Sequence, residues 1–498
     1  MKKVLISAFL FVGTLLTASL PAEAIDFKAK GVWDFNFEWQ QSSFIKGDGN
    51  DRFSPKQRLR TQIDIVASES LKGVVFFELG KTTWGRGVDG ASIGTDGKNV
   101  IKLRYSYVDW VIPYTDVQVR MGLQPYVLPG FVAGSTILDA DGAGVTVSAV
   151  FNDYLGATAF WMRALHKNYD SNYGISKLPN FKGTTLDVVG LTIPVTISDI
   201  KIAPWGMFAF AGKKSLLGES YGDIEDVRAG LLPAMPAGFG YSWGAGNPFG
   251  DVFPNKKRGN AWWVGLSAEL AGSSPLHIAV DGAYGRADLG SLRNVVIGDF
   301  LLDKIDLKRQ GWYAALLAEY KFEYVTPGII GWYASGDKVD SRGASKRIPT
   351  LVGNWAATSF GYSGAYGIGK DSVFGNTIAG SWGVVVQLKD ISFLENLTHV
   401  IRGARIQGTN NKDVPEHLGL SYVTTIYDTR GGDNMVYLTK KDYAWEVDFD
   451  TEYKIYKDLS VALELSYIRL ELDKKLWNLQ KEVDKNAYRA GLNMKYQF

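Results

Sequence analysis

Apolar and polar residues alternate strictly in windows of about ten residues along most of the chain. In KGVWDFNFEW, residues 30–39, aromatic side chains fill the odd positions from 33 to 39 and polar side chains the even positions from 34 to 38. In the stretch 443–452, aromatic and apolar residues again alternate with acidic ones. A period of two is that of a β-strand with two unlike faces.

Eighteen segments show this alternation and are predicted to be strands. Their approximate spans are 27–39, 56–68, 72–83, 100–112, 115–125, 143–151, 154–164, 184–197, 199–211, 259–271, 275–286, 308–322, 325–335, 378–389, 397–408, 443–455, 458–470 and 485–498.

The connections between these segments also alternate, in length. Short turns are predicted at 68–73, 113–116, 152–154, 198–199, 272–275 and 456–458, and long connections at 212–258, 336–377 and 409–442. A soluble β-sandwich or β-helix would explain the alternation equally well, but not this asymmetry. Short turns on one side and long loops on the other are typical of outer-membrane barrels. In hydrocarbon a sheet must close on itself, because unpaired backbone groups are costly there.

We therefore predict an all-β protein: a transmembrane antiparallel β-barrel of about 18 strands, with 16 as the main alternative. Aromatic residues recur near the ends of the apolar faces, where interfacial girdles are expected. These residues are Trp33, Trp39, Trp84, Tyr105, Tyr107, Trp262, Trp312, Tyr443, Tyr467 and Tyr496.

The N-terminal residues predict export. Lys2 and Lys3 precede an apolar stretch to about residue 18 and then Ala22-Glu23-Ala24, a pattern typical of a cleaved signal peptide. We expect a signal peptide at 1–24, a single barrel domain at 25–498 and a location in the Gram-negative outer membrane, in contact with its lipid.

Cysteine is absent, so the fold has no disulfides, and a formal net charge of +2 gives no reason to expect a nucleic-acid partner.

Short motifs occur in a fixed order along the chain: AIDFKAKGVW at 24–33, QRLRTQIDIVASESLKGVVFFELGKTTWG at 57–85, GLQPYVLPGF at 122–131, LDADGAG at 138–144 and the terminal YQF. Together they resemble the outer-membrane homotrimeric porins of sulfate-reducing bacteria, of the general diffusion type. The resemblance implies a homotrimer in which each barrel has its own water-filled pore. In the wider porin group the third external loop folds into the barrel, and here that constriction loop is the segment 126–142, whose carboxylates are Asp139 and Asp141.

Strand parity assigns charged side chains to the lumen. A pore-lining basic ladder is predicted from Arg58, Arg60, Lys102, Arg104 and Arg120, and an opposite acidic wall from Glu446, Asp448, Asp450 and Glu452. Opposed rows of charge in a narrow channel favour small polar solutes. Alternatively, both sets solvate the interior without setting selectivity.

An enzymatic function has little support. The four histidines, His166, His277, His399 and His417, lie on separate segments without metal-ligand spacing, so no metal and no cofactor are predicted. A membrane-embedded hydrolase that joins His277 to a strand serine by folding remains the least favoured alternative.

The sequence thus predicts a porin for passive diffusion of small hydrophilic solutes and ions, with no catalytic residues. The alternatives are a substrate-specific channel for a sugar, amino acid or organic acid, a hydrolase, and a structural barrel closed by its own loops. The last strand, ending in Phe498, is expected to pair with the first, and Phe498 is expected to be the assembly signal read by the barrel-insertion machinery.

Overall fold

The structure is a computed structural model. It describes residues 25–41, 52–87, 92–93, 101–166, 185–213, 215–216, 224–233, 255–272, 275–297, 300–339, 344–362, 364, 366–368, 372–417, 437–477 and 485–498. The predicted signal peptide, residues 1–24, lies outside these ranges.

The described part of the chain consists almost entirely of β-strands. The strands are β1 (Asp26–Gln41), β2 (Arg52–Ser68), β3 (Leu71–Thr83), β4 (Ile101–Val111), β5 (Val117–Val127), β6 (Asp139–Asn152), β7 (Leu155–His166), β8 (Thr185–Thr192), β9 (Val195–Ile197), β10 (Ile200–Gly212), β11 (Arg258–Leu270), β12 (Leu276–Ile297), β13 (Phe300–Tyr320), β14 (Thr326–Ala334), β15 (Ala344–Ser345), β16 (Ser381–Leu394), β17 (Leu397–Gly408), β18 (Tyr443–Tyr456), β19 (Leu459–Glu471) and β20 (Asn486–Gln497). Two short helices, α2 (Ile224–Leu231) and α3 (Val414–His417), lie in long connections.

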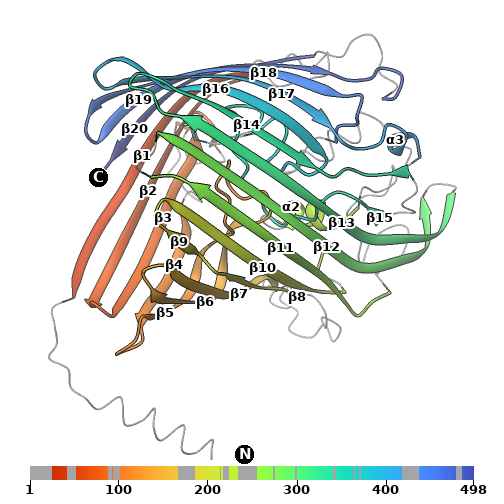
Figure 1. Ribbon diagram of the computed structural model, residues 1–498, viewed down its shortest axis with the longest axis horizontal. Coiled ribbons are helices and arrows are strands. Elements are labelled where there is room, and N and C mark those ends of the chain that lie inside the picture. Colours follow the sequence, from red (N-terminus) through yellow and green to blue (C-terminus); the bar gives the residue numbers. More distant parts are fainter. Residues whose placement is uncertain are drawn as a thin grey trace, which may run out of the picture.

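The strands form one closed antiparallel barrel (Figure 1). Of the twenty described strands, β8 and β9 pair with the same two neighbours, β7 and β10, and so form one interrupted strand. The two-residue β15 only adds to the rim of β13, because β14 pairs directly with β16. The ring therefore has eighteen strands, as predicted, and it is closed by the pairing of β1 with β20.

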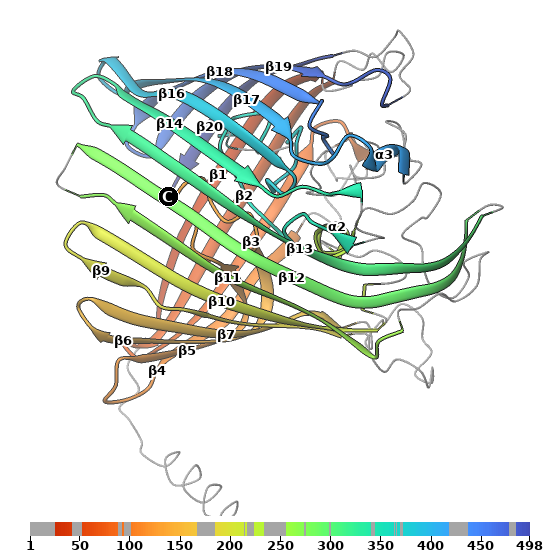
Figure 2. The same cartoon turned by 45° about the vertical axis from the view of Figure 1, so that its right-hand side comes forward.

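The two ends of the barrel differ as the connection lengths predict. Two-residue turns join β2 to β3 and β6 to β7, whereas α2 and α3 both lie toward the opposite end (Figure 2). Phe498 lies at the short-turn end and extends the pairing of β20 with β1, since its N–H donates to the carbonyl oxygen of Gly31. No helix in the described residues is long and apolar enough to cross a membrane.

Two strands are longer than the alternation predicts. The hairpin of β12 and β13 stays paired out to Ile297 and Phe300, although the sequence pattern ended at 286 and restarted at 308. The register shifts between Asp288 and Ser291, where Gly290 has a φ of +98°. This bulge interrupts the period of two without ending the strand pairing, so the alternation stops before the strand does.

Two aromatic residues assigned to the girdle lie elsewhere. Tyr107 pairs with Val74, which is buried on the inner face of β3, and the Arg120 guanidinium lies 4.2 Å from the centre of the Tyr107 ring. Tyr105 pairs with Phe76 on the same face. The reason is a bulge opposite Phe76 and Phe77, which shifts the parity of β4 by one residue.

Candidate functional site

The inner and outer faces of the barrel follow the sequence alternation. On β1, Asn36 and Glu38 point inward and are 0% and 1% exposed, whereas Trp33 on the outer face is 39% exposed. Apolar side chains are exposed on the outer face all around the ring, for example Leu266, Val386 and Val447. An apolar outer face on a closed sheet is the surface that a hydrocarbon environment requires.

The connection between β5 and β6 folds into the lumen. Residues 128–138 leave the β5 end and reach the wall formed by β11 and β12, where the backbone N–H groups of Phe131 and Val132 donate to the Asp281 carboxylate at 3.0 and 2.8 Å. The Ser267 hydroxyl donates to the carbonyl oxygen of Pro129 on the same wall. The segment lies within the predicted constriction loop 126–142.

The constriction loop is shorter than predicted. Asp139 and Asp141 belong to β6, because they pair with Val127 and Pro125 of β5. Asp139 accepts a hydrogen bond from Asn354 Nδ2, and Asp141 from Arg104 Nε at 2.7 Å. Both carboxylates therefore contact neighbouring groups directly instead of facing the cations from across the lumen.

The described residues of a second segment, 344–380, also fold inward, and no pattern in the sequence predicted this. It hydrogen-bonds to the first segment through successive backbone groups: Leu351 N–H to Ile137, and Asn354 N–H to Ser135. The Ile378 N–H donates to the Thr136 hydroxyl. We name the described residues of 128–138 and 344–380 the inner plug.

The inner plug has an apolar core of its own inside the barrel. Its fully buried apolar side chains include Leu128, Ile137, Leu138, Trp355, Phe360, Tyr362 and Phe374. They pack against inward-facing apolar residues of β10 and β11, such as Trp205 and Trp263, and Trp263 Nε1 donates to the carbonyl oxygen of Pro349 at 2.7 Å. The sequence did carry a signal here, because residues 202–211 are apolar on both strand faces, as expected of a strand covered on both sides.

The acidic residues of β18 lie beneath the inner plug. Glu446 accepts hydrogen bonds from the backbone N–H groups of Phe360 and Gly361, and Asp448 from that of Ser359. Asp450 accepts from the Ser359 hydroxyl and is paired with Arg402 at 2.5 Å. The three carboxylates are inward-facing, as parity predicts, but they are buried and hold the plug, so they are not exposed to lumen water. Glu452, nearer the short turn, is half-buried.

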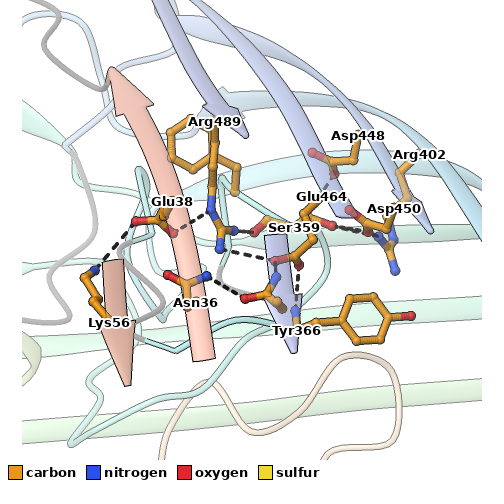
Figure 3. A network of polar contacts seen from close by, with 12 residues as sticks. Asn36, Glu38, Lys56, Ser359, Tyr366, Arg402, Asp448, Asp450, Glu464 and Arg489 are labelled. Carbon is orange, nitrogen blue, oxygen red and sulfur yellow. Dashed lines mark hydrogen bonds and ion pairs between the residues drawn. The ribbon is translucent and has the colours of Figure 1, made fainter. Parts of the chain in front are cut away.

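Arg489 of β20 connects this row to the barrel seam (Figure 3). It donates to Glu38 of β1 at 3.0 Å, to Glu464 of β19 at 3.4 Å and to the carbonyl oxygen of Ser359 at 2.9 Å. Glu464 also accepts from the Tyr366 N–H of the plug. Burial raises the pKa of the Tyr366 hydroxyl to about 12, ahead of the smaller effects of Glu452 and Asp450, so the phenol stays neutral beside this network.

The predicted basic ladder lies on strands β2, β4 and β5, and each of its arginines contacts a carboxylate. Arg58 pairs with Asp34 at 2.7 Å and Arg120 with Asp109 at 2.6 Å. Arg60 and Arg104 share Glu78, at 2.7 and 3.2 Å. Lys102 is exposed and lies beside Glu78 in the register. The wall thus has alternating charges, whereas the predicted ladder consisted of cations alone.

Most arginines of this wall are more exposed than their partners, except that Arg104 and Asp141 are about equally exposed, at 28% and 26%. The Arg60 side chain is 27% exposed against 4% for Glu78, and Arg120 is 29% exposed against 5% for Asp109. Inward-facing residues of β2 are half-buried along the strand, whereas those of β10 and β19 are buried. The plug therefore covers the β10–β20 side, whereas the arginines on β2, β4 and β5 keep partly exposed side chains.

His277 has acidic partners. Its ring nitrogens lie 3.4 Å from Glu319 and 3.6 Å from Glu269. In the ranges that the structure describes, no serine hydroxyl is hydrogen-bonded to His277, which is the contact that the hydrolase alternative requires.

Sequence comparison finds no family model and no curated protein that matches the chain. Solved structures with a similar fold include OprD of Pseudomonas aeruginosa, with 11% identity over 96% of this chain and 97% of that chain and a TM-score of 0.48. OpdK of the same organism, solved with vanillate, has 11% identity over 95% and 98% and a TM-score of 0.48. OccAB3 of Acinetobacter baumannii has 11% identity over 95% and 100% and a TM-score of 0.47.

Proposed function

We propose that this protein is an outer-membrane channel that selects small anionic solutes, such as organic acids, and not a wide general diffusion pore. The observation that carries the proposal is the exposed guanidinium surface of Arg60, Arg104 and Arg120 along the part of the lumen that the inner plug leaves open. A passing carboxylate meets the guanidinium groups of Arg60 and Arg120 before it meets their more buried partners Glu78 and Asp109. Planar guanidinium groups bind carboxylates in two-point geometry, which favours them over neutral solutes of the same size.

The inner plug supports selectivity over free diffusion. Two segments joined by backbone hydrogen bonds, with an apolar core and anchors on β12, β18 and β19, cover one side of the lumen. A solute that passes is held near the opposite charged wall, where the narrow, low-dielectric surroundings strengthen electrostatic discrimination. The wide, water-filled pore of a general diffusion porin would need this volume to be open.

Planar-bilayer recordings with a matched pair of solutes test the proposal. We expect benzoate to block the current in a saturable way, while benzamide, of the same shape but uncharged, does not. Large ohmic conductance with neither solute blocking would contradict selectivity and favour general diffusion. Steps in groups of three would support the homotrimer, which we propose from the resemblance of the sequence.

A variant of the plug anchor tests its role in the same recordings. Glu446→Ala removes the acceptor of two backbone N–H groups, and each buried donor left unsatisfied costs about 1–3 kcal/mol. We expect faster hydrogen exchange at Phe360 and Gly361 and a higher conductance. Glu452→Ala, on the same face of β18, is the control and should leave the hydrogen exchange and the conductance unchanged.

A further inference from the structure

A groove of about 730 Å³ lies on the outside of the barrel, near the long-loop end of β12, β13 and β14. It is separate from the lumen wall described above. Its lining includes Tyr284, Trp312 and Tyr333 from the strands and Lys338, Lys346 and Lys440 from the connections. The volume is within the range typical of small-molecule sites.

The strand side of the groove is aromatic. Tyr284, Trp312 and Tyr333 are outward-facing and 38–46% exposed. The Trp312 and Tyr333 rings stack at 5.3 Å, and Tyr284 contacts the Trp262 ring at 5.5 Å. Such a band on the outer face marks the boundary between the apolar and polar layers of a membrane, where aromatic rings are favoured.

The loop side of the groove is cationic. Lys338 and Lys346 come from the connection between β14 and β16, and Lys440 from the connection between β17 and β18. The one acidic lining residue, Asp337, is buried, and its oxygens already accept hydrogen bonds from Ser345, the Lys346 N–H and Tyr437. Across the described ranges, neither Lys346 nor Lys440 forms an ion pair with a carboxylate.

The backbone that carries these lysines is fixed in place. The carbonyl oxygen of Lys346 accepts from the Ser335 hydroxyl at 2.7 Å, and that of Lys440 accepts from Gln407 at 2.6 Å. Lys346 approaches β13 so closely that a β-carbon on Gly311 would lie 2.4 Å from its carbonyl oxygen. The positions of the charges are therefore set by the fold, although their side chains are long.

We infer that this groove binds the phosphorylated head group of an outer-leaflet lipid. The lysines meet the phosphate, the aromatic rings lie along the sugar or glycerol and the upper acyl carbons, and the lipid chains continue down the apolar outer face. A free anion would use only the lysines and would leave the aromatic half without a partner. A second copy of the chain is less suited, because the described lining offers cations and no exposed carboxylate to a self-complementary contact.

The site rests on the proposed membrane location but not on the choice of solute. The test uses the full-length protein in detergent, with native mass spectrometry to count retained lipid. The probes are diphosphoryl lipid A, phosphatidylcholine and inorganic phosphate. We expect diphosphoryl lipid A to be retained, with phosphatidylcholine and inorganic phosphate bound at least tenfold more weakly.

Variants locate the binding. Lys346→Gln with Lys440→Gln should weaken lipid A binding by about tenfold or more, since each lysine near an anionic head group contributes on the order of a factor of five. The control is Lys412→Gln with Lys441→Gln, which removes two exposed lysines already paired with Asp413 and Asp473 and should leave binding unchanged. Both variants should conduct as the wild type, which shows that they fold and separates this test from that of the channel.

Three results would overturn the inference. The first is equal retention of lipid A by both double variants. The second is binding of phosphatidylcholine as tight as that of lipid A, and the third is binding of inorganic phosphate as tight as that of lipid A. A photocrosslinker at Tyr284 provides a second readout. Crosslinking to lipid supports the site, whereas crosslinking to another copy of the chain would assign the groove to a subunit interface.

Discussion

The ring of Phe498 covers Gly31 across the seam where the last strand meets the first. A β-carbon on Gly31 would lie 2.6 Å from Cζ of that ring and 2.5 Å from the carbonyl oxygen of Arg60. The two residues also exchange backbone hydrogen bonds, at 2.8 and 3.0 Å. An aromatic ring over a glycine on a neighbouring strand shields the glycine backbone and fixes the register of the pair.

Gly31→Val is expected to weaken the seam. The added side chain has no space between the ring and the Arg60 carbonyl, so we expect the free energy of unfolding to fall by about 1–3 kcal/mol, as for overpacked sites. Urea titration with gel mobility of the unheated sample measures this. Gly331→Val is the control, because no atom lies within 4 Å of its added β-carbon. An equal loss of unfolding free energy in both variants would mean that the Phe498 ring does not restrict the space for a side chain at position 31.

Neutralising the arginines of the charged wall should shift ion selectivity toward cations. Replacing Arg58, Arg60, Arg104 and Arg120 by Gln leaves the four carboxylates Asp34, Glu78, Asp109 and Asp141 without their arginine partners. The reversal potential in a salt gradient measures the shift. The paired variant Arg120→Gln with Asp109→Asn is charge-neutral and should shift selectivity much less than Arg120→Gln alone. An unchanged reversal potential in the fourfold variant would show that ions do not pass this wall.

Arg489→Met should be among the most destabilising single changes. The guanidinium is buried between Glu38 and Glu464, and removing one partner of a buried ion pair typically costs about 3–5 kcal/mol, because the remaining charge has no compensation. Chemical unfolding measures the loss. Adding Glu464→Gln should recover part of it, and no recovery would show that the loss comes from packing alone.

Cysteine accessibility should distinguish the open and covered sides of the lumen, since the chain has no native cysteine. Thr146→Cys lies on the inner face of β6 near Arg120, where residues are half-buried. Ala462→Cys lies on the inner face of β19 and is buried. A charged methanethiosulfonate should react at position 146 and lower the conductance, but not react at 462. Equal reactivity would mean that the inner plug leaves the β19 wall open.

The long-loop end should gain stability on acidification through Asp442, which lies outside the strands. Burial raises the pKa of this carboxyl, despite hydrogen bonds from Thr439, Asp473 and Trp477 that oppose the shift. A raised pKa in the folded state means that the contribution is full below the ordinary value near about pH 4 and is lost as the pH rises through the folded value. We expect the unfolding free energy to fall between pH 3 and 7 more steeply in the wild type than in Asp442→Asn. If the unfolding free energy had the same pH dependence in the wild type and in Asp442→Asn, the effect would not come from Asp442.

Much of the barrel could be predicted from the sequence. The alternation from Trp33 to Trp39 assigned the two faces of β1 correctly, and the short turns at 152–154 and 198–199 lie between the strands that they were predicted to join. These features are local, since a strand places successive side chains on opposite faces whatever the rest of the chain does. The strand count follows from them.

The tertiary structure decided what lies inside the ring. Glu446 and Phe360 are 86 positions apart, and Val132 and Asp281 are 149 apart, so no local period reveals that these residues meet. The same holds for the carboxylates beside Arg58, Arg60 and Arg120, which come from neighbouring strands of the sheet, and for the bulge that turns Tyr107 inward. Sequence alternation thus determined which side chains face the lumen. Only long-range contacts determined which of them the inner plug buries and which remain for a solute to meet, because covering one face of a strand leaves its period of two unchanged.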